Sequence, residues 1–193
     1  MKNHTLFLTA VAVAGVLQAC SNNNGPSAAD NTMKTDTTTV RASATPEAST
    51  AMADTAFANK AAMGGMAEVA LGKMAADKST DTNVKDFGDL MVKDHGKAND
   101  ELASIAKSEN IQLPTSLDAK HQALSDSLSK LSGKAFDKAY VNAMLEGHKQ
   151  TLALLQDEAA NGKDPQLKAF AVNTATVVQG HLDKIEKIHD GMK

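Results

Sequence analysis

The stretch VKDFGDLMVKDHGKANDELASIA, residues 84–106, has the apolar spacing of a long amphipathic helix. Apolar side chains recur every three or four residues, so an α-helix would place them all on one side. One position on that side is His95, where an apolar residue is expected. The pattern therefore predicts a helix over residues 81–109 whose buried side carries a polar residue at its midpoint. The stripe consists of Val84, Phe87, Met91, His95, Ala98, Leu102 and Ile105.

The same spacing predicts four further helices. Asp54 is a suitable N-cap for the first of them, and Pro165 suits the first turn of the last. Gly64, Gly65 and Gly72 lie inside the first helix, where glycine usually allows a neighbouring helix to approach closely. These helices are predicted over residues 54–78, 116–131, 134–160 and 165–190.

Four long helices, with a short one in the middle connection, predict an all-α four-helix bundle. The composition agrees, since 42% of the residues are hydrophobic but only 3% are aromatic. This is typical of a helical core built from Ala, Leu, Val and Met. The connection between the helices at 81–109 and 134–160 is long enough to cross the bundle. A ferritin-like topology, in which these two helices are parallel, and a simple up-down-up-down topology are both consistent with the sequence.

The charge distribution gives no reason to expect a nucleic-acid partner. The formal net charge is −3, and no block of Lys and Arg occurs in the 193 residues. Nucleic-acid-binding domains usually carry a basic patch or stripe. We therefore expect no nucleic acid among the partners.

The N-terminus has the order of a secretory signal peptide over residues 1–19. A short basic start, MKNH, is followed by an apolar run that is short for a membrane span and ends in Ala19. The sequence Leu17-Gln18-Ala19-Cys20 resembles a bacterial lipobox, which predicts cleavage before Cys20 and lipidation of that residue. An ordinary signal peptide followed by a chance cysteine is the alternative. Cys20 is the single cysteine, which excludes an intrachain disulfide and a thiolate metal cluster.

Residues 20–53 are predicted to form the lipidated cysteine and a disordered tether. The segment is rich in Ser, Thr, Asn, Ala and Asp and lacks apolar periodicity. A flexible chain of this length spans about 30 Å. Such a tether would hold the bundle domain, residues 54–190, near a membrane to which the lipid binds. By resemblance to Gram-negative lipoproteins, Ser21 after the cysteine implies an outer-membrane address on the periplasmic face of the envelope.

Each long helix carries one ionisable residue near the middle of its apolar stripe. Their offsets from the helix midpoints are within roughly 6 Å, so they should meet at one level under either topology. A buried polar group without a partner costs about 1–3 kcal/mol, so these groups should satisfy one another or share an ion. Three imidazoles and a carboxylate suit one transition-metal ion, Zn, Fe, Mn or Cu. A hydrogen-bonded network without metal, which fixes the helix register, is the alternative. The four residues are Glu68, His95, His148 and His181.

Four further residues lie near these positions. Asp94 precedes His95 and either orients a histidine or faces solvent. Met91 and Met144 lie one helical turn before their histidines, where a thioether would suit copper, although methionine in an apolar stripe is usually core. Tyr140 is most simply a core residue.

The chain resembles the predicted exported proteins of domain of unknown function 4142. The resemblance is carried by AEVALGKMA, VKDFGDLMVKDHGKANDELASIA, LSGKAFDKAYVNAMLEGH and the LKAFA…HL of the last helix, and it covers about residues 54–190. It implies a ferritin-like bundle, export and a bacterial envelope address, but no activity. The stretch NTATVVQGHL departs from the family pattern, because it lacks a proline before the histidine. The matching positions include Glu68, Asp94, His95, Tyr140, His148 and His181.

These observations predict a lipoprotein with a non-enzymatic role in envelope maintenance or stress. No nucleophile–base arrangement and no glycine-rich phosphate loop occurs in the sequence, which argues against an enzyme. The alternative is a metal-dependent redox or storage protein of ferritin-like type. Nothing in the charge pattern indicates a protein partner.

Overall fold

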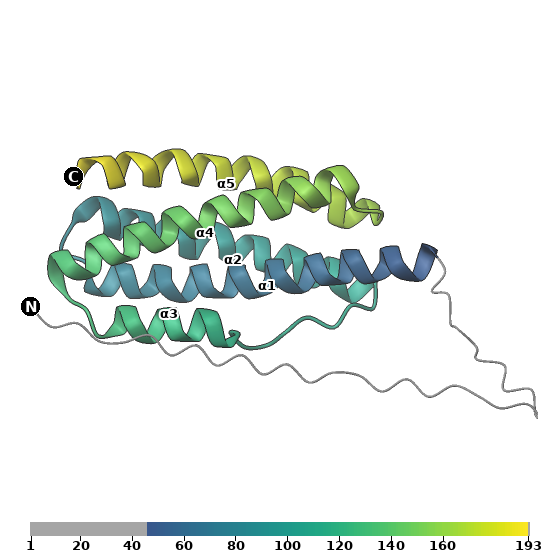
Figure 1. Ribbon diagram of the computed structural model, residues 1–193, viewed down its shortest axis with the longest axis horizontal. Coiled ribbons are helices and arrows are strands. Elements are labelled where there is room, and N and C mark those ends of the chain that lie inside the picture. The colour runs from purple at the N-terminus through teal and green to yellow at the C-terminus, as the bar shows by residue number, and fades with distance from the viewer. Residues whose placement is uncertain (1–45, 193) are drawn as a thin grey trace, which may run out of the picture. The chain divides into compact units, whose positions relative to one another are not determined.

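The computed structural model describes residues 46–192, which form five α-helices and no strand. The prediction of an all-α fold is therefore confirmed. The predicted signal peptide, Cys20 and most of the predicted tether lie outside the described residues. The helices are α1 (Pro46–Lys78), α2 (Thr82–Ser108), α3 (Ala119–Ser129), α4 (Gly133–Asn161) and α5 (Pro165–Gly191), as Figure 1 shows.

Helix α1 begins at Pro46, eight residues before its predicted start. Proline suits the first turn of a helix, and the alanines that follow favour its continuation. Asp54 is therefore inside the helix, and its prediction as an N-cap is wrong. Its carboxylate instead accepts hydrogen bonds from the backbone N–H groups of Lys163, at 3.1 Å, and Asp164, at 2.8 Å. This contact ties α1 to the connection between α4 and α5.

The caps of the other helices come mostly from aspartates. Asp81 and Asp164 accept hydrogen bonds from the first backbone N–H groups of α2 and α5. Pro165 occupies the first turn of α5, as predicted. The cap of α3 is Asp118, which accepts from the backbone N–H of His121 at 2.8 Å. Side-chain oxygens at these positions satisfy N–H groups that have no partner within the helix.

The directions of the helices follow from contacts at their ends. Thr80, just before α2, donates a hydrogen bond to Asp137 at the start of α4, so both helices begin at the same end of the bundle. Gln166, at the start of α5, donates to Glu109 at the end of α2. Helices α2 and α4 therefore run parallel, and α5 runs opposite to both. The connection through α3 returns along the bundle, as Figure 1 shows, which differs from a simple up-down-up-down order.

One pair of glycines allows α1 and α2 to pack closely. A Cβ atom added to Gly72 would lie 2.7 Å from the carbonyl oxygen of Gly88, and one added to Gly88 would lie 2.6 Å from that of Gly72. Larger side chains at this crossing would push the two backbones apart. The sequence also predicts a close approach of a neighbouring helix at Gly64, but a Cβ atom added there would meet nothing within 4 Å.

Two apolar clusters fill the bundle on either side of its middle. The buried apolar residues of the helices pack against one another. None of the described helices is long and apolar enough to cross a membrane. The first cluster, near the α1–α2 connection, includes Leu71, Phe87, Met91, Phe136 and Tyr140. The second, near the α4–α5 connection, includes Phe57, Leu102, Leu155, Leu167 and Phe170.

Candidate metal centre

The polar residues at the middle of the four long helices converge between the two apolar clusters. Glu68 of α1, His95 of α2, His148 of α4 and His181 of α5 are 6%, 5%, 0% and 3% exposed. Each interrupts an apolar stripe that faces the bundle interior. The fold therefore places four ionisable side chains in a part of the bundle that is shielded from solvent.

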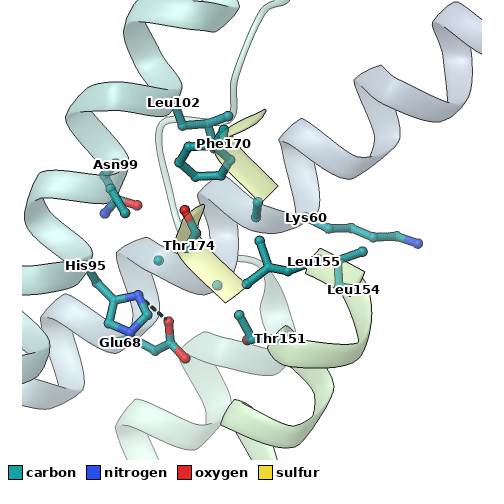
Figure 2. Close-up of a pocket in the computed structure, with 14 residues that line it drawn as sticks. Lys60, Glu68, His95, Asn99, Leu102, Thr151, Leu154, Leu155, Phe170 and Thr174 are labelled. Atoms are coloured by element: carbon teal, nitrogen blue, oxygen red, sulfur yellow. Dashed lines mark ion pairs between the residues drawn. The ribbon is translucent and has the colours of Figure 1, made fainter. Parts of the chain in front are cut away.

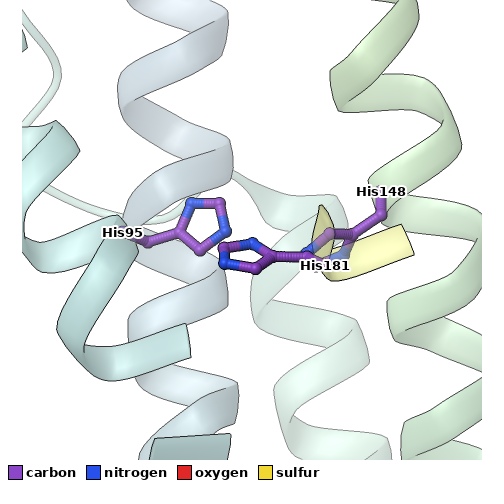
Figure 3. A group of neighbouring side chains, drawn as sticks. All are labelled: His95, His148 and His181. Atoms are coloured by element: carbon purple, nitrogen blue, oxygen red, sulfur yellow. The ribbon is translucent and has the colours of Figure 1, made fainter. Parts of the chain in front are cut away.

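The side chains of the three histidines point toward one another, as Figure 3 shows. The ring centroids of His95 and His148 are 5.6 Å apart, those of His95 and His181 5.3 Å, and those of His148 and His181 5.5 Å. One ligand atom from each ring lies within 4.8 Å of the other two. Among the residues that the structure describes, this is the group of His, Cys, Asp or Glu side chains that could hold a metal ion.

Each histidine uses one ring nitrogen to bind an oxygen atom. Nδ1 of His95 lies 2.8 Å from Oε2 of Glu68, and Nε2 of His181 lies 3.0 Å from Oδ2 of Asp94. Nδ1 of His148 donates to the carbonyl oxygen of Met144 at 2.9 Å. A carbonyl or an ionised carboxylate only accepts, so each of these three nitrogens carries a proton.

The other nitrogen of each ring is buried without a partner. Nε2 of His95, Nε2 of His148 and Nδ1 of His181 have no hydrogen bond within residues 46–192. In a neutral ring each of these atoms carries a lone pair. Histidines that bind metals usually donate their other N–H to a carboxylate or a backbone carbonyl, which fixes the tautomer and the orientation of the ring. The three rings have this arrangement.

Burial favours the neutral form of two of the three rings, those of His148 and His181. Burial lowers the pKa of His148, and attraction to Glu68 offsets this only in part. Burial also lowers the pKa of His181, to about 4, against the hydrogen bond with Asp94. Burial alone would raise the pKa of Glu68, but the charge and hydrogen bond of His95 lower it. Neutral imidazoles are the form that binds a metal ion.

Glu68, which the sequence groups with the three histidines, lies on their proton-bearing side. Its carboxylate contacts Nδ1 of His95 and lies 3.7 Å from Nδ1 of His148. These are the proton-bearing nitrogens, so the carboxylate orients the rings. Asp94 orients His181 in the same way. Because the two residues lie on different helices, the spacing of residues within one helix does not predict this contact.

Met91, Met144 and Tyr140 belong to the first apolar cluster. Tyr140 stacks on Phe136, with ring centroids 5.9 Å apart, and its buried hydroxyl has no partner in the described part of the chain. Burial and the charge of Glu68 raise the pKa of Tyr140. The ring of Phe87 packs against His148, at 5.7 Å between centroids, and thus covers the histidines from this side.

Asp137 is a buried acid that the sequence analysis did not single out. It is 4% exposed and accepts hydrogen bonds from the hydroxyls of Ser79, at 2.6 Å, and Thr80, at 3.2 Å. Its position directly after Phe136 and one turn before Tyr140, two buried residues of α4, is the signal that could have revealed it. Asp137 fastens the start of α4 to the α1–α2 connection.

Three cavities surround the centre. A small one of about 30 Å³, shown in Figure 2, lies beside Glu68 and His95. A groove of about 300 Å³ between α2 and α5, which we call the α2–α5 groove, is lined by Asp94, His95 and His181. A groove of about 560 Å³ between α1, α3 and α4, the α1–α4 groove, is lined by Glu68 and His121. His121 binds Asp118 at 2.8 Å and stays apart from the three buried histidines.

Comparison with known proteins gave one family and several solved structures. The family model described as "Domain of unknown function (DUF4142)" matches residues 38–188. No curated protein matches the chain.

The similar structures share the fold at low sequence identity. A DUF305 fragment from Deinococcus radiodurans is 11% identical with a TM-score of 0.64, and the match covers 72% of this chain and 95% of that one. CopM in its Cu(II)-bound form is 12% identical with a TM-score of 0.63, covering 72% and 97%. CopM in its Ag-bound form is 13% identical with a TM-score of 0.59, covering 72% and 96%. Identities this low show a common fold and nothing further.

Proposed function

The chain belongs to the DUF4142 family, and from this premise we propose that its bundle binds one transition-metal ion between His95, His148 and His181. One observation carries the proposal. One nitrogen of each ring is buried without a hydrogen-bond partner while the opposite nitrogen lies against an oxygen, and one ligand atom of each ring lies within 4.8 Å of the other two. A shared ion would satisfy all three lone pairs at once.

A hydrogen-bonded network without metal is the competing explanation. Such a network stabilises a bundle when its members satisfy one another. The histidines bind Glu68, Asp94 and the Met144 carbonyl, but none of them binds another histidine. The network accounts for the nitrogen of each ring that lies against an oxygen, but it gives no partner to the other, buried nitrogen. A bound metal ion would supply that partner.

The donor set suits Zn, Fe, Mn or Cu. Imidazole nitrogen is a good ligand for copper and zinc, whereas manganese prefers more oxygen ligands. CopM shares the fold and was solved with Cu(II) and with Ag, which makes copper the first ion to test. Met91 and Met144 lie one turn from their histidines, in the first apolar cluster.

Metal content of the purified, untagged chain tests the proposal. After reconstitution and desalting, mass spectrometry should find one ion per chain in the wild type. His148→Ala removes a fully buried ligand and should lower metal affinity by more than about 100-fold, since even residues that orient ligands contribute about 10- to 100-fold. His121→Ala is the matched control, since His121 lies on α3 outside the group, and should keep the ion.

Circular dichroism distinguishes loss of metal from loss of folding. His95→Gln, which keeps a polar group of similar length, is the second variant in case His148→Ala unfolds. If wild type binds no stoichiometric ion, the proposal is wrong and the hydrogen-bonded network is the remaining explanation.

We also propose that the bundle has the ferritin-like arrangement. The parallel course of α2 and α4 and the long connection between them, which contains α3, support this. The proposed role is to bind or store the ion in the bacterial cell envelope, without catalysis.

The envelope location depends on Cys20. Lipidation there would anchor the bundle to a membrane, and Ser21 supports the outer membrane. Cys20→Ser should release the protein from the membrane fraction into the soluble periplasm. If the variant sediments with membranes as the wild type does, the lipid anchor is wrong while the metal proposal is unaffected.

A further inference from the structure

The three histidines leave the coordination of the ion incomplete. Zinc and copper sites usually have four ligands, and sites that take a ligand from solution have three from the protein. Among the described residues, the candidate group contains three histidines and no fourth side chain. Glu68 and Asp94 contact the histidines, but both do so at the proton-bearing nitrogens. The fourth position is therefore free of a protein carboxylate.

Two sides of the centre are closed by side chains. Toward the α1–α2 connection, the ring of Phe87 packs against His148 and His181, with centroids 5.7 Å and 6.4 Å apart. Toward α1, Glu68 lies against His95. The cavity beside these two residues has a volume of about 30 Å³, which is room for about one water molecule.

The α2–α5 groove, in contrast, reaches two of the three ligands. Its lining includes His95 and His181, together with Asp94 and Thr174. Val177, one turn before His181 on α5, lines the groove and is 45% exposed. The volume of about 300 Å³ exceeds the need of a single water and accommodates a five-membered ring.

We propose that the fourth coordination position opens on the α2–α5 groove and takes a small neutral donor molecule from solution. This inference rests on the proposed function, since it requires the ion to be bound. It adds that the centre exchanges a ligand with its surroundings.

The charges around the site explain why a neutral donor is expected. Glu68 and Asp94, each in contact with a histidine, together carry two negative charges. They balance a divalent ion, so an anion would add an uncompensated charge to a buried site, which is costly. The groove also carries Lys97 and Glu101, whose charges cancel. Water or a neutral nitrogen donor fits these conditions.

Imidazole is a suitable probe, and Co²⁺ is a suitable ion because its absorption spectrum depends on the ligands. Imidazole added to the Co²⁺-loaded full chain should shift this spectrum in a saturable way while the ion stays bound, which is checked by metal content after desalting. Val177→Trp places a large ring over the groove and should raise the imidazole concentration at half-saturation at least about tenfold, the equivalent of 1.4 kcal/mol.

Gln150→Trp is the matched control. Gln150 is exposed and lines the α1–α4 groove, so tryptophan there would obstruct the other side of the bundle. It should leave the imidazole response unchanged. Val177→Ala should leave the response unchanged or strengthen it, which separates obstruction of the groove from loss of the valine.

Three results would overturn this inference. If Co²⁺ binds but imidazole produces no saturable change, a residue of the chain fills the fourth position and the inference is wrong. If Gln150→Trp weakens the response and Val177→Trp does not, the ligand comes from the α1–α4 side and the inference is also wrong. If Co²⁺ does not bind to the wild type, the proposed function fails, and this inference fails with it.

Discussion

The bundle contains two kinds of buried polar group, and they differ in how completely they are satisfied. At its ends, Asp137 accepts from the hydroxyls of Ser79 and Thr80, and Asp54 accepts from two backbone N–H groups of the α4–α5 connection. In the middle, each of three histidines keeps one nitrogen unpaired. The end groups fasten connections between helices. The middle groups keep nitrogen atoms that make no hydrogen bond within the described residues.

The largest effect on stability is expected at the ends. Asp137→Asn replaces a charged acceptor of two hydroxyls with an amide and should lower the free energy of unfolding by about 2–3 kcal/mol. Metal affinity should be unchanged, because Asp137 does not belong to the histidine group. Urea denaturation and a metal titration of the same variant check both statements. A large loss of metal affinity with unchanged stability would show that the two regions are not separate.

The second-largest effect is expected on metal affinity, from a change beside the histidines in the middle of the bundle. Asp94→Asn removes the charge that orients His181, so affinity should fall by about 10- to 100-fold. The stability of the metal-free chain should change little, since the Asp94 side chain is 25% exposed. Competition with a chelator of known affinity measures the first quantity. Full affinity in this variant would mean that His181 needs no orientation by Asp94.

Glu158 is a buried acid near an end of the bundle, and it differs from Asp54 and Asp137 in how its carboxylate is satisfied. Its Oε1 has no hydrogen bond within the described residues. Burial, followed by repulsion from Asp54 and Asp164, raises its pKa from 4.5 to about 7, while Lys168 opposes the shift. Between these values the native state binds more protons than the unfolded state, so stability falls as the pH rises.

Glu158→Gln should therefore stabilise the protein on the order of 1 kcal/mol at about pH 8 and less at about pH 5. Urea denaturation at both pH values measures the difference. Glu186→Gln, an exposed position on α5, is the control and should show no such pH dependence. An equal gain at both pH values would contradict the assignment to Glu158.

The smallest effect is expected from His181→Leu in the metal-free chain. Leucine has a similar volume and carries no unpaired nitrogen, and the released Asp94 side chain reaches solvent. The free energy of unfolding should change by less than about 1.5 kcal/mol. A loss of several kcal/mol would show that His181 is needed for the fold itself, which favours the network without metal.

The sequence predicted the helices and the residues of the middle layer because both follow from periodicity. A polar residue in an apolar stripe faces the interior whatever its partners are, so His95, His148 and His181 could be found from spacing alone. The N-cap Asp164 and Pro165 were predictable for a similar local reason.

Contacts between helices were not predictable in this way. Periodicity gives the side of a helix but not which residue of another helix lies opposite. The pairing of Asp94 with His181, 87 positions apart, depends on how α2 and α5 pack. The same holds for Glu68, whose contact with Nδ1 of His95 depends on how α1 and α2 pack. Asp54 looked like a local cap because its real partners are more than 100 positions away.

Anomalous X-ray scattering from a crystal of the Cu²⁺-loaded chain locates the ion itself. We expect a single strong peak between α2, α4 and α5, about 2 Å from Nε2 of His95, Nε2 of His148 and Nδ1 of His181. Glu68 and Asp94 should remain on the opposite nitrogens. A peak only at surface residues such as His121, with no scattering between the three buried rings, would contradict the proposed metal site.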